Sequence, residues 1–382
     1  MWRLVLTLTL FCWGSEGQLQ PVTCRDNNGA EVDWFIIYKA PGEIIRGTRT
    51  YKKEMKYFYT DSAARVSHML PGASGYKNLN DPSGALANTL RPVLKKIRNM
   101  PPNFGFISYS DQPPGCQAKL DFGHSKGVIM VEKYNNGVWL LHSTPRFPFR
   151  RDQNYFWPDS GLRNAQTFIC VTFPYDEFRN IGKHLQYIGA FPFEHDIPDD
   201  FHQELIDATK WVQAPPPSNY RALTSTGGQR FLSIAKQVKT TDPGNKRPRT
   251  TDGDLYYTIA QSVSSHVYVQ TWGCHKDRTS SDCSDPLHKV YNIKTINKVL
   301  GPQSTWEPKS DHSKWCVTKS QNKAWTCIAD VNRAETQYKR RGGALCIENE
   351  AVRNKFLEFA EDFEDCMTPT IMDTDSDCDT TD

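Results

Sequence analysis

Two copies of the tripeptide His-Ser-Lys stand nearly half a chain apart, one at residues 124–126 and the other at 312–314. A neutral imidazole can attack phosphorus, a protonated imidazole can supply a proton to a leaving oxygen, and an ammonium group can hold phosphoryl oxygens. Alternate residues of an extended strand point to one face, so each histidine should project beside its lysine. If the two copies meet in one cleft, they form a site that breaks phosphodiesters without a metal or other cofactor. His124, Lys126, His312 and Lys314 are therefore the candidate catalytic residues.

The residues after each tripeptide predict a β-hairpin. In the first copy two apolar runs, 128–131 and 138–141, flank an Asn136-Gly137 turn signal and end at His142. In the second copy the runs 315–317 and 325–329 flank a polar turn and end at Asp330. His142 and Asp330 each follow their histidine by 18 residues. This matched context predicts a duplicated α+β or mixed α/β fold, in which two sheet-centred halves related by a pseudo-twofold axis each carry a His-x-Lys hairpin.

Two arguments predict different positions for His142. A two-residue turn at Asn136-Gly137 would set it opposite Val131, outside the reach of His124. The duplicated plan instead brings it close to the site, which requires a wider turn or a bulge. We take His142 as a candidate for positioning the substrate phosphate, together with Asn332, its rough counterpart in the second half.

The chain divides into four predicted segments. Residues 1–17 resemble a secretory signal peptide, because Arg3 is followed by an apolar stretch of about 10 residues, too short to span a bilayer. An N-terminal half, 18–213, carries the first His-x-Lys, and a C-terminal half, 214–366, carries the second. The proline-rich stretch 214–219 separates them, and the acidic residues 367–382 predict a disordered tail.

Several elements are clear enough to predict. Alternating or continuous apolar patterns indicate strands at 34–38, 104–110 and 168–173, and apolar residues at helical spacing indicate a helix from Asn349 to about Asp365. Residues 239–254 combine lysine and arginine with Thr, Pro and Gly, which predicts a long loop. Tyr256 and Tyr257 follow it, so the segment is compatible with a groove for a nucleic-acid strand or with an ordinary exposed loop.

Ten cysteines remain after the predicted signal peptide. An even number in an exported chain indicates disulfide bonds, most of them in the C-terminal half. A zinc site built from Cys274, His275, Cys283 and His288 is the alternative, although its spacing matches no compact zinc motif. The sequence contains no Asn-x-Ser/Thr site for N-glycosylation. We expect a protein of the secretory pathway, either secreted or lysosomal.

The formal charge of +3 is unevenly distributed, because five aspartates fall in the last ten residues. The rest of the chain is basic and suits a polyanionic partner. Histidine protonation below about pH 6.5 would strengthen such binding.

The chain also resembles the deoxyribonuclease II family, whose fold is related to the phospholipase D superfamily. The resemblance runs through most of the mature chain and is carried by long, ordered segments: Val32-Asp33-Trp34-Phe35 with Tyr38-Lys39, Tyr109-Ser110-Asp111-Gln112-Pro113-Pro114, Gly123-His124-Ser125-Lys126-Gly127, His142-Ser143-Thr144-Pro145-Arg146-Phe147-Pro148, and Asp311-His312-Ser313-Lys314-Trp315.

The resemblance implies a metal-independent acid endonuclease that contacts the backbone of double-stranded DNA and leaves 3′-phosphate and 5′-hydroxyl ends. It further implies that one histidine forms a phosphohistidine and the other protonates the leaving 5′ oxygen. We assign the nucleophile to His124 and the general acid to His312. The phospholipase D pattern also has an aspartate five residues after each lysine, but Val131 and Lys319 stand there. A carboxylate that orients each imidazole must therefore come from elsewhere in the chain.

Other functions stay open. A ribonuclease with two histidines and a lysine would need a 2′-hydroxyl on its substrate. A lipid phosphodiesterase has less support, because no interfacial amphipathic helix or membrane anchor is indicated. The main alternative is a secreted, non-catalytic DNA-binding or toxin protein that keeps the nuclease fold. Serine catalysis is not indicated, because Gly72-Ala73-Ser74-Gly75 lacks the Gly-x-Ser-x-Gly spacing.

Overall fold

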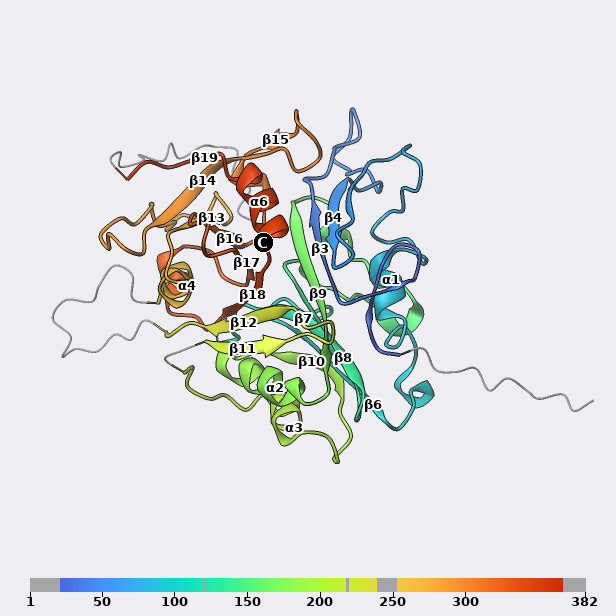
Figure 1. Cartoon of the computed structure of the whole chain (residues 1–382). Coiled ribbons are helices and arrows are strands. Elements are labelled where there is room, and N and C mark those ends of the chain that lie inside the picture. Colours follow the sequence, from blue (N-terminus) through green and yellow to red (C-terminus); the bar gives the residue numbers. More distant parts are fainter. Residues whose placement is uncertain (1–20, 118, 120, 218–219, 239–252, 367–382) are drawn as a thin grey trace, which may run out of the picture.

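A computed structural model describes residues 21–117, 119, 121–217, 220–238 and 253–366 (Figure 1). The predicted signal peptide, nearly all of the loop 239–254 and the acidic tail 367–382 lie outside these described residues. The described chain combines large sheets with a few helices, which confirms the mixed α+β class.

The first large sheet contains strands from the N-terminal part of the chain, each antiparallel to its neighbours. Its spatial order is β10 (Pro192–Asp196), β6 (Phe104–Ser110), β7 (Lys126–Glu132), β8 (Asn136–His142), β9 (Gln166–Pro174), β3 (Trp34–Lys39), β4 (Tyr57–Asp61) and β5 (Val66–Met69). A separate ribbon pairs β1 (Cys24–Arg25) with β2 (Glu31–Val32).

Strands from the C-terminal part form the second large sheet, in which only the β13–β14 pair is parallel among the described strands. Its order is β11 (Arg221–Thr224), β12 (Arg230–Ala235), β18 (Gly343–Glu348), β17 (Trp325–Ala329), β16 (Trp315–Thr318), β13 (Val267–Gln270), β14 (Val290–Asn297) and β15 (Thr305–Trp306), with β19 (Asp362–Phe363) also paired to β14.

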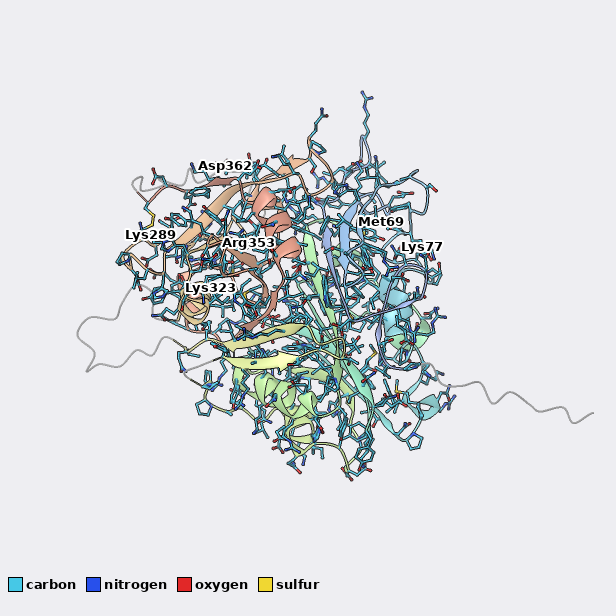
Figure 2. All side chains as sticks on the ribbon, in the orientation of Figure 1. Met69, Lys77, Lys289, Lys323, Arg353 and Asp362 are labelled. Atoms are coloured by element: carbon cyan, nitrogen blue, oxygen red, sulfur yellow. A yellow bond between two sulfur atoms is a disulfide. The ribbon has the colours of Figure 1, made fainter. Side chains whose placement is uncertain are left out.

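The helices are α1 (Ala85–Leu90), α2 (Glu177–Ile188), α3 (Gln203–Thr209), α4 (Leu255–Val263), α5 (Glu335–Tyr338) and α6 (Glu350–Phe359), with 3₁₀ turns at Ile97–Asn99, Arg151–Gln153, Asp159–Gly161 and Pro308–Ser310. The side chain of Asn349 accepts a hydrogen bond from the Val352 amide and so caps the start of α6. Buried Arg353, labelled in Figure 2, donates to the carbonyls of Thr318 and Lys319 and ties α6 to the end of β16.

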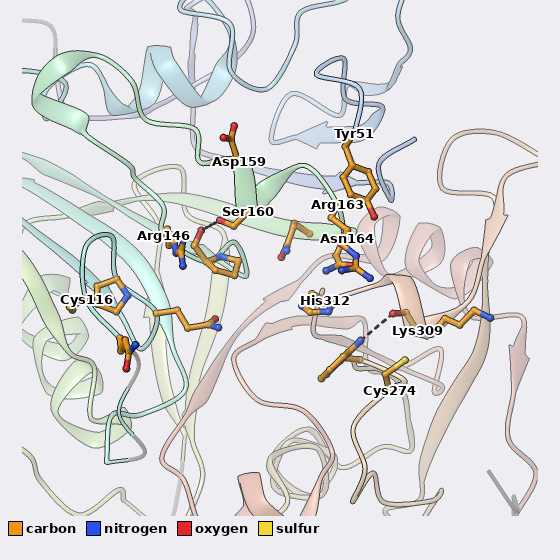
Figure 3. A pocket seen from close by; sticks show the side chains of 16 residues that line it. Tyr51, Cys116, Arg146, Asp159, Ser160, Arg163, Asn164, Cys274, Lys309 and His312 are labelled. Atoms are coloured by element: carbon orange, nitrogen blue, oxygen red, sulfur yellow. Dashed lines mark hydrogen bonds between the residues drawn. The ribbon is translucent and has the colours of Figure 1, made fainter. Parts of the chain in front are cut away.

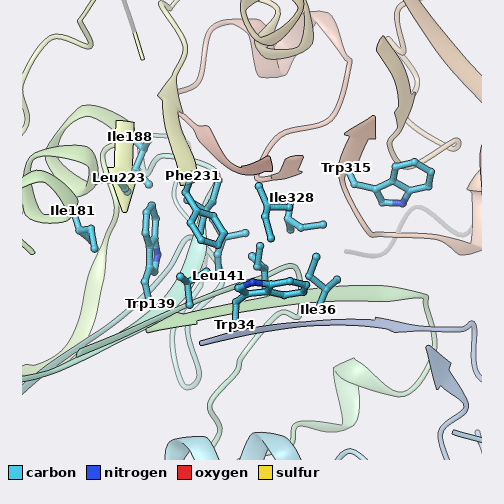
Figure 4. Close-up of a cluster of buried hydrophobic side chains, with 14 of the residues drawn as sticks. Trp34, Ile36, Trp139, Leu141, Ile181, Ile188, Leu223, Phe231, Trp315 and Ile328 are labelled. Carbon is cyan, nitrogen blue, oxygen red and sulfur yellow. The ribbon is translucent and has the colours of Figure 1, made fainter. Parts of the chain in front are cut away.

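One hydrophobic core is shared by the two large sheets (Figure 4). Trp34, Trp139 and Leu141 of the first sheet belong to the same buried cluster as Phe231 and Ile328 of the second. Apolar residues of α2 and α6 complete this cluster, while the outer face of each sheet has a cluster of its own. Because the sheets share a core, residues at their facing ends are held in fixed positions relative to one another.

The predicted strands at 34–38, 104–110 and 168–173 are confirmed. The predicted helix is present but ends at Phe359, and Phe363 lies in β19 instead. The predicted turn at Asn136-Gly137 is wrong. Both residues belong to β8, and the chain turns through 133–135, where Tyr134 adopts a positive φ of 64°.

Disulfide bonds join Cys24 to Cys170, Cys283 to Cys366 and Cys327 to Cys346, and Cys274 is disulfide-bonded as well. Because Cys274 and Cys283 are in disulfide bonds, they cannot bind zinc as thiolates, which rules out the zinc alternative. These bonds fit a secreted or lysosomal protein. Within the described ranges, no helix combines the length and apolar character that a membrane crossing requires.

Candidate active site

The first tripeptide leads into β7, at the centre of the first sheet. Gly127 pairs with Leu141, so His142 stands opposite Lys126 across the β7–β8 hairpin. The turn through 133–135, displaced from Asn136-Gly137, is what brings His142 to this position. Gly127 is required locally, because a Cβ atom there would lie 2.3 Å from the Tyr109 hydroxyl.

The second tripeptide leads into β16 of the second sheet. Trp315 pairs with Ile328, and the Ala329 amide donates a 2.8 Å hydrogen bond to the Lys314 carbonyl. This register places the end of β17, and Asp330 after it, beside the tripeptide. The Lys314 ammonium donates a 2.8 Å hydrogen bond to the carbonyl of His312.

Each histidine is bonded through its backbone to the other half of the chain. The His124 amide donates to the Arg341 carbonyl at 2.9 Å, and the His312 amide donates to the Ala165 carbonyl at 3.0 Å. Arg341 precedes β18 and Ala165 precedes β9. The two bonds are reciprocal, and they hold both tripeptides at the junction of the two sheets.

A small cavity of about 10 Å³ lies where the tripeptides meet. It is lined by His124, Ser125, Lys126, His142, Ser143, Lys314 and Asp330. Its volume suits about one water molecule. Nδ1 of His124 and Oδ1 of Asp330 are buried and have no hydrogen-bond partner among the described residues. Neither ring nitrogen of His142 makes a hydrogen bond of ordinary geometry with a described residue. These atoms are able to form hydrogen bonds with a polar group that enters the cavity.

Asp111 supplies the carboxylate that the sequence pattern lacked near the first histidine. Its Oδ1 accepts a 2.5 Å hydrogen bond from Lys126 Nζ, and its Oδ2 lies 4.0 Å from His124 Nε2 and 3.2 Å from an Arg340 guanidinium nitrogen. Burial alone would raise the pKa of Asp111, but Lys126, His124 and Arg340 together hold it well below its usual range. Asp111 is therefore an anion that fixes Lys126 and faces the first imidazole.

His312 has a different environment from His124. The ring of Trp272 packs against it with a centroid distance of 4.7 Å, and the Trp272 indole N–H donates to the Lys309 carbonyl at 3.1 Å. Both residues line a large cavity of about 730 Å³ (Figure 3). Arg146, Arg163 and Lys309 also line it with one carboxylate, Asp159, so a recess with an excess of positive charge adjoins the second histidine.

Burial and nearby cations depress the basicity of both histidines. Burial lowers the pKa of His124 well below its ordinary value, and Lys126, Arg340 and Lys314 lower it further, against the opposing effect of Asp111. The pKa of His312 is likewise lowered well below its ordinary value, first by burial and then by Lys314, Lys126 and Arg163. Lys126 and Lys314 thus act on both imidazoles, which places the two tripeptides in one electrostatic environment.

The remaining predicted residues divide into two groups. His142 lines the small cavity with three of the four candidate catalytic residues, and burial and Lys126 lower its pKa well below the usual value. Asn332 does not line either cavity just described; its Oδ1 accepts a 3.1 Å hydrogen bond from the Trp272 amide. Asn332 thereby supports the tryptophan that packs on His312.

Sequence reasoning did not select four residues that shape the site: Asp111, Asp330, Arg163 and Trp272. A signal existed for two of them. Asp111 stands within the quoted segment 109–114, and Asp330 has the same spacing from His312 that His142 has from His124. Arg163 and Trp272 carry no comparable pattern, because only the packing of the two halves brings them to His312.

Comparisons with known proteins identify the family of this chain. The family model for deoxyribonuclease II matches residues 23–366. Plancitoxin-1 of Acanthaster planci is 33% identical over 94% of this chain and 97% of its own length, and deoxyribonuclease-2-beta of Homo sapiens is 31% identical over 90% and 92%. The structure of a yeast tyrosyl-DNA phosphodiesterase aligns with a TM-score of only 0.30 at 10% identity, over 63% of this chain and 70% of that one, and we draw nothing from it. A deoxyribonuclease is a phosphodiester hydrolase, and the chain belongs to the deoxyribonuclease II family.

Proposed function

We propose that this protein is a metal-independent acid endodeoxyribonuclease that hydrolyses double-stranded DNA to 3′-phosphate and 5′-hydroxyl ends. The observation that carries the proposal is the small cavity, where Lys314 of the second tripeptide meets His124 and Lys126 of the first. Lys126 and Lys314 supply fixed positive charge for phosphoryl oxygens, a role that metal ions serve in other nucleases. The family membership supports DNA as the substrate.

The reaction runs in two displacements. In the first, an imidazole nitrogen of His124 forms a bond to phosphorus, the P–O5′ bond breaks, and the leaving oxygen takes a proton from protonated His312. In the second, water attacks the phosphohistidine, His312 accepts the proton of that water, and the P–N bond breaks to release the 3′-phosphate. His142, facing Lys126 at the cavity wall, positions the phosphate.

The depressed histidine pKa values favour acid conditions. At neutral pH both catalytic imidazoles are neutral in the free protein, so the general acid lacks its proton. The phosphate of bound DNA raises both pKa values, and acid completes the protonation of His312. Rate should therefore rise as pH falls, until protonation of His124 removes the nucleophile. The resulting bell-shaped profile belongs to the coupled pair.

We also propose that the two halves arose by duplication of a phospholipase D-like unit. The strand order β6-β7-β8-β9-β3 in the first sheet parallels β13-β16-β17-β18-β12 in the second, and every pair within both sets is antiparallel. A helix follows the fourth strand in each set: α2 after β9 and α6 after β18. The reciprocal bonds of His124 and His312 support the same relationship. The division at residue 214 falls between the last strand of the first sheet and the first strand of the second.

The test is cleavage of supercoiled plasmid at about pH 5 in excess chelator, with wild type, His124→Ala, His312→Ala and the control His195→Ala, which alters an exposed histidine on β10. Wild type and the control should cut, and both site variants should lose activity. Survival of cutting in either site variant would overturn the two-histidine mechanism. No cutting by wild type would favour the alternative, a secreted DNA-binding or toxin protein that keeps the fold without catalysis.

Roles are assigned by trapping the intermediate. With a strand labelled at its 5′ end, His312→Ala should accumulate labelled protein after denaturation by detergent at alkaline pH, which preserves the acid-labile P–N bond, because the phosphohistidine forms and retains the upstream strand. His124→Ala should accumulate none. The opposite pattern would exchange the two roles.

A further inference from the structure

The connection between β3 and β4 folds into a small hairpin, here called the basic arm and defined as residues 43–52. Ile44 and Tyr51 form an antiparallel bridge, the Lys52 amide donates to the Glu43 carbonyl at 2.8 Å, and the Ile45 amide donates to the Thr50 carbonyl at 2.8 Å. Gly47 adopts a positive φ of 79° at the tip. The basic arm is therefore a regular hairpin whose shape is set by its own backbone bonds.

The strand that leads to the tip of the basic arm exposes two adjacent isoleucines. Ile44 is 55% exposed and Ile45 is 42% exposed. Single apolar residues at a surface need no explanation, but two neighbours on an ordered turn between charged residues are unusual. Arg46 and Arg49 stand beside them and are exposed.

The charges of the basic arm differ between its base and its tip. Lys52 forms an ion pair with Glu43 at the base, and Lys56 pairs with the same carboxylate. Arg46 and Arg49 at the tip form no ion pair with any residue that the structure describes. The tip is therefore positively charged, and the two exposed isoleucines lie on the strand that leads to it.

Tyr51 connects the basic arm to the active site. Its side chain lines the same large cavity as His312 and Arg163, and Figure 3 shows it at the cavity edge facing Arg163. A polyanion whose phosphate lies at the histidines would leave the cavity past this residue. The arm therefore stands at the rim over which the substrate must pass.

We propose that the basic arm is a second DNA-contact site, which grips the duplex next to the cleaved phosphate. This inference rests on the proposed function and adds the surface that selects duplex over short substrates. Arg46 and Arg49 contact backbone phosphates, and Ile44 and Ile45 lie against sugars and base edges in the minor groove. Minor-groove proteins combine these two residue types in the same way.

Duplex DNA fits this tip better than a protein partner does. A stable protein interface buries about 800 Å² on each side, with a sizeable apolar centre. Two exposed isoleucines provide far less apolar surface, while the positive charge of Arg46 and Arg49 matches a phosphate backbone. Through Tyr51 the arm also adjoins the large cavity, where a phosphate backbone is expected.

Two arm variants test the proposal, Ile44→Ser/Ile45→Ser and Arg46→Gln/Arg49→Gln. Each is assayed on duplex DNA and on thymidine 3′-(4-nitrophenyl phosphate), a small ester that reaches the histidines without touching the arm. We expect KM for duplex to rise roughly tenfold in the arginine variant, with unchanged kcat/KM for the ester. Its slope of log kcat/KM against log salt should become shallower by about 1.8, because two phosphate contacts are lost.

The matched control is Lys289→Gln/Lys323→Gln, which removes two positive charges from connections of the second sheet, away from the arm (Figure 2). An unchanged duplex KM and salt slope in the arm variants would overturn the proposal. So would an equal loss on the ester, because that result would assign the arm to the integrity of the catalytic site. Failure of the proposed function itself is distinguishable, since wild type would then cleave neither substrate.

Discussion

Tyr38 and Asp311 meet across the junction of the two sheets, where the phenol donates a 2.5 Å hydrogen bond to Oδ2 of the carboxylate. The same oxygen accepts from the Trp306 indole at 2.7 Å, and Oδ1 accepts from the Ser313 amide at 2.8 Å. Asp311 directly precedes His312. A residue of β3 thus fixes the backbone that presents His312, the second candidate catalytic histidine.

Tyr38→Phe should lower both stability and turnover. The buried carboxylate of Asp311 loses one donor, which costs about 1–3 kcal/mol of unfolding free energy. The position of His312 relaxes, so kcat should fall severalfold, with KM little changed. Denaturant unfolding and steady-state kinetics measure the two effects. Tyr59→Phe is the control, because Tyr59 donates to Asp61 at 2.9 Å on the same sheet. An equal kcat loss in both variants would contradict a role for Tyr38 in positioning His312.

Asp111→Asn should damage the first half of the site. It removes the anion beside buried Lys126, and leaving such a charge without its partner costs about 3–5 kcal/mol. Asp111 raises the pKa of His124, so its loss lowers that pKa and moves the limb of the pH–rate profile governed by His124 to lower pH. The pH–rate profile of the folded fraction measures this displacement.

A comparison variant separates catalysis from stability. Asp254→Asn breaks an equally buried ion pair with Arg333, 3.0 Å long, in the second half of the chain. It should destabilise the protein to a similar degree while the pH profile stays in place. A displaced profile in this variant too, or an unmoved one in Asp111→Asn, would count against the assigned role of Asp111.

Much of the fold and part of the candidate site could be predicted from local sequence patterns. The strands at 34–38 and 168–173 are apolar enough to be recognised without tertiary information, and the spacing within each His-Ser-Lys is a property of one strand. The segments that resemble the deoxyribonuclease II family added an expected fold and an expected reaction to these local predictions. The turn after β7 was misplaced because Asn136-Gly137 is a strong local turn signal, yet strand pairing carried both residues into β8.

Residues that reach the site across the sheet junction could not be predicted. Asp111 contacts Arg340, and the His124 amide contacts the Arg341 carbonyl, more than two hundred positions away in the sequence. The helix at 349–365 shows the same limitation, because Phe363 kept the helical spacing but pairs with Ile293 in β19 and β14. Such contacts depend on how two complete sheets pack, which no local pattern encodes.

Asp330 should act as a neutral carboxylic acid. Burial raises its pKa well above the ordinary value, and the Gly343 amide donates a 3.1 Å hydrogen bond to its Oδ2. Asp330 lines the small cavity, and its Oδ1 has no hydrogen-bond partner among the residues that the structure describes. A protonated Oδ1 can donate to a phosphoryl oxygen. Asp330→Asn keeps a donor and should retain activity within about threefold, whereas Asp330→Leu, which removes it, should lose at least about a hundredfold in kcat. Inactivity of the asparagine variant would show instead that the carboxylate is required in its ionised form.

His184 should make the protein sensitive to acid. It lies buried on α2 with its ring 5.2 Å from that of Trp139, and burial lowers its pKa to about 3. The unfolded chain takes up this proton near pH 6.5 while the folded chain does not, so the stability present above pH 6.5 is lost as pH falls toward 3. The loss is about 1.4 kcal/mol per pH unit, or about 2 kcal/mol at pH 5.

In His184→Leu, the difference in unfolding free energy between pH 7.5 and pH 5 should shrink by about 2 kcal/mol, measured by denaturant unfolding at both pH values. His195→Leu, on the exposed face of β10, should leave the difference unchanged. A wild-type difference that persists in His184→Leu would mean that other groups set the acid limit, foremost the buried histidines of the active site.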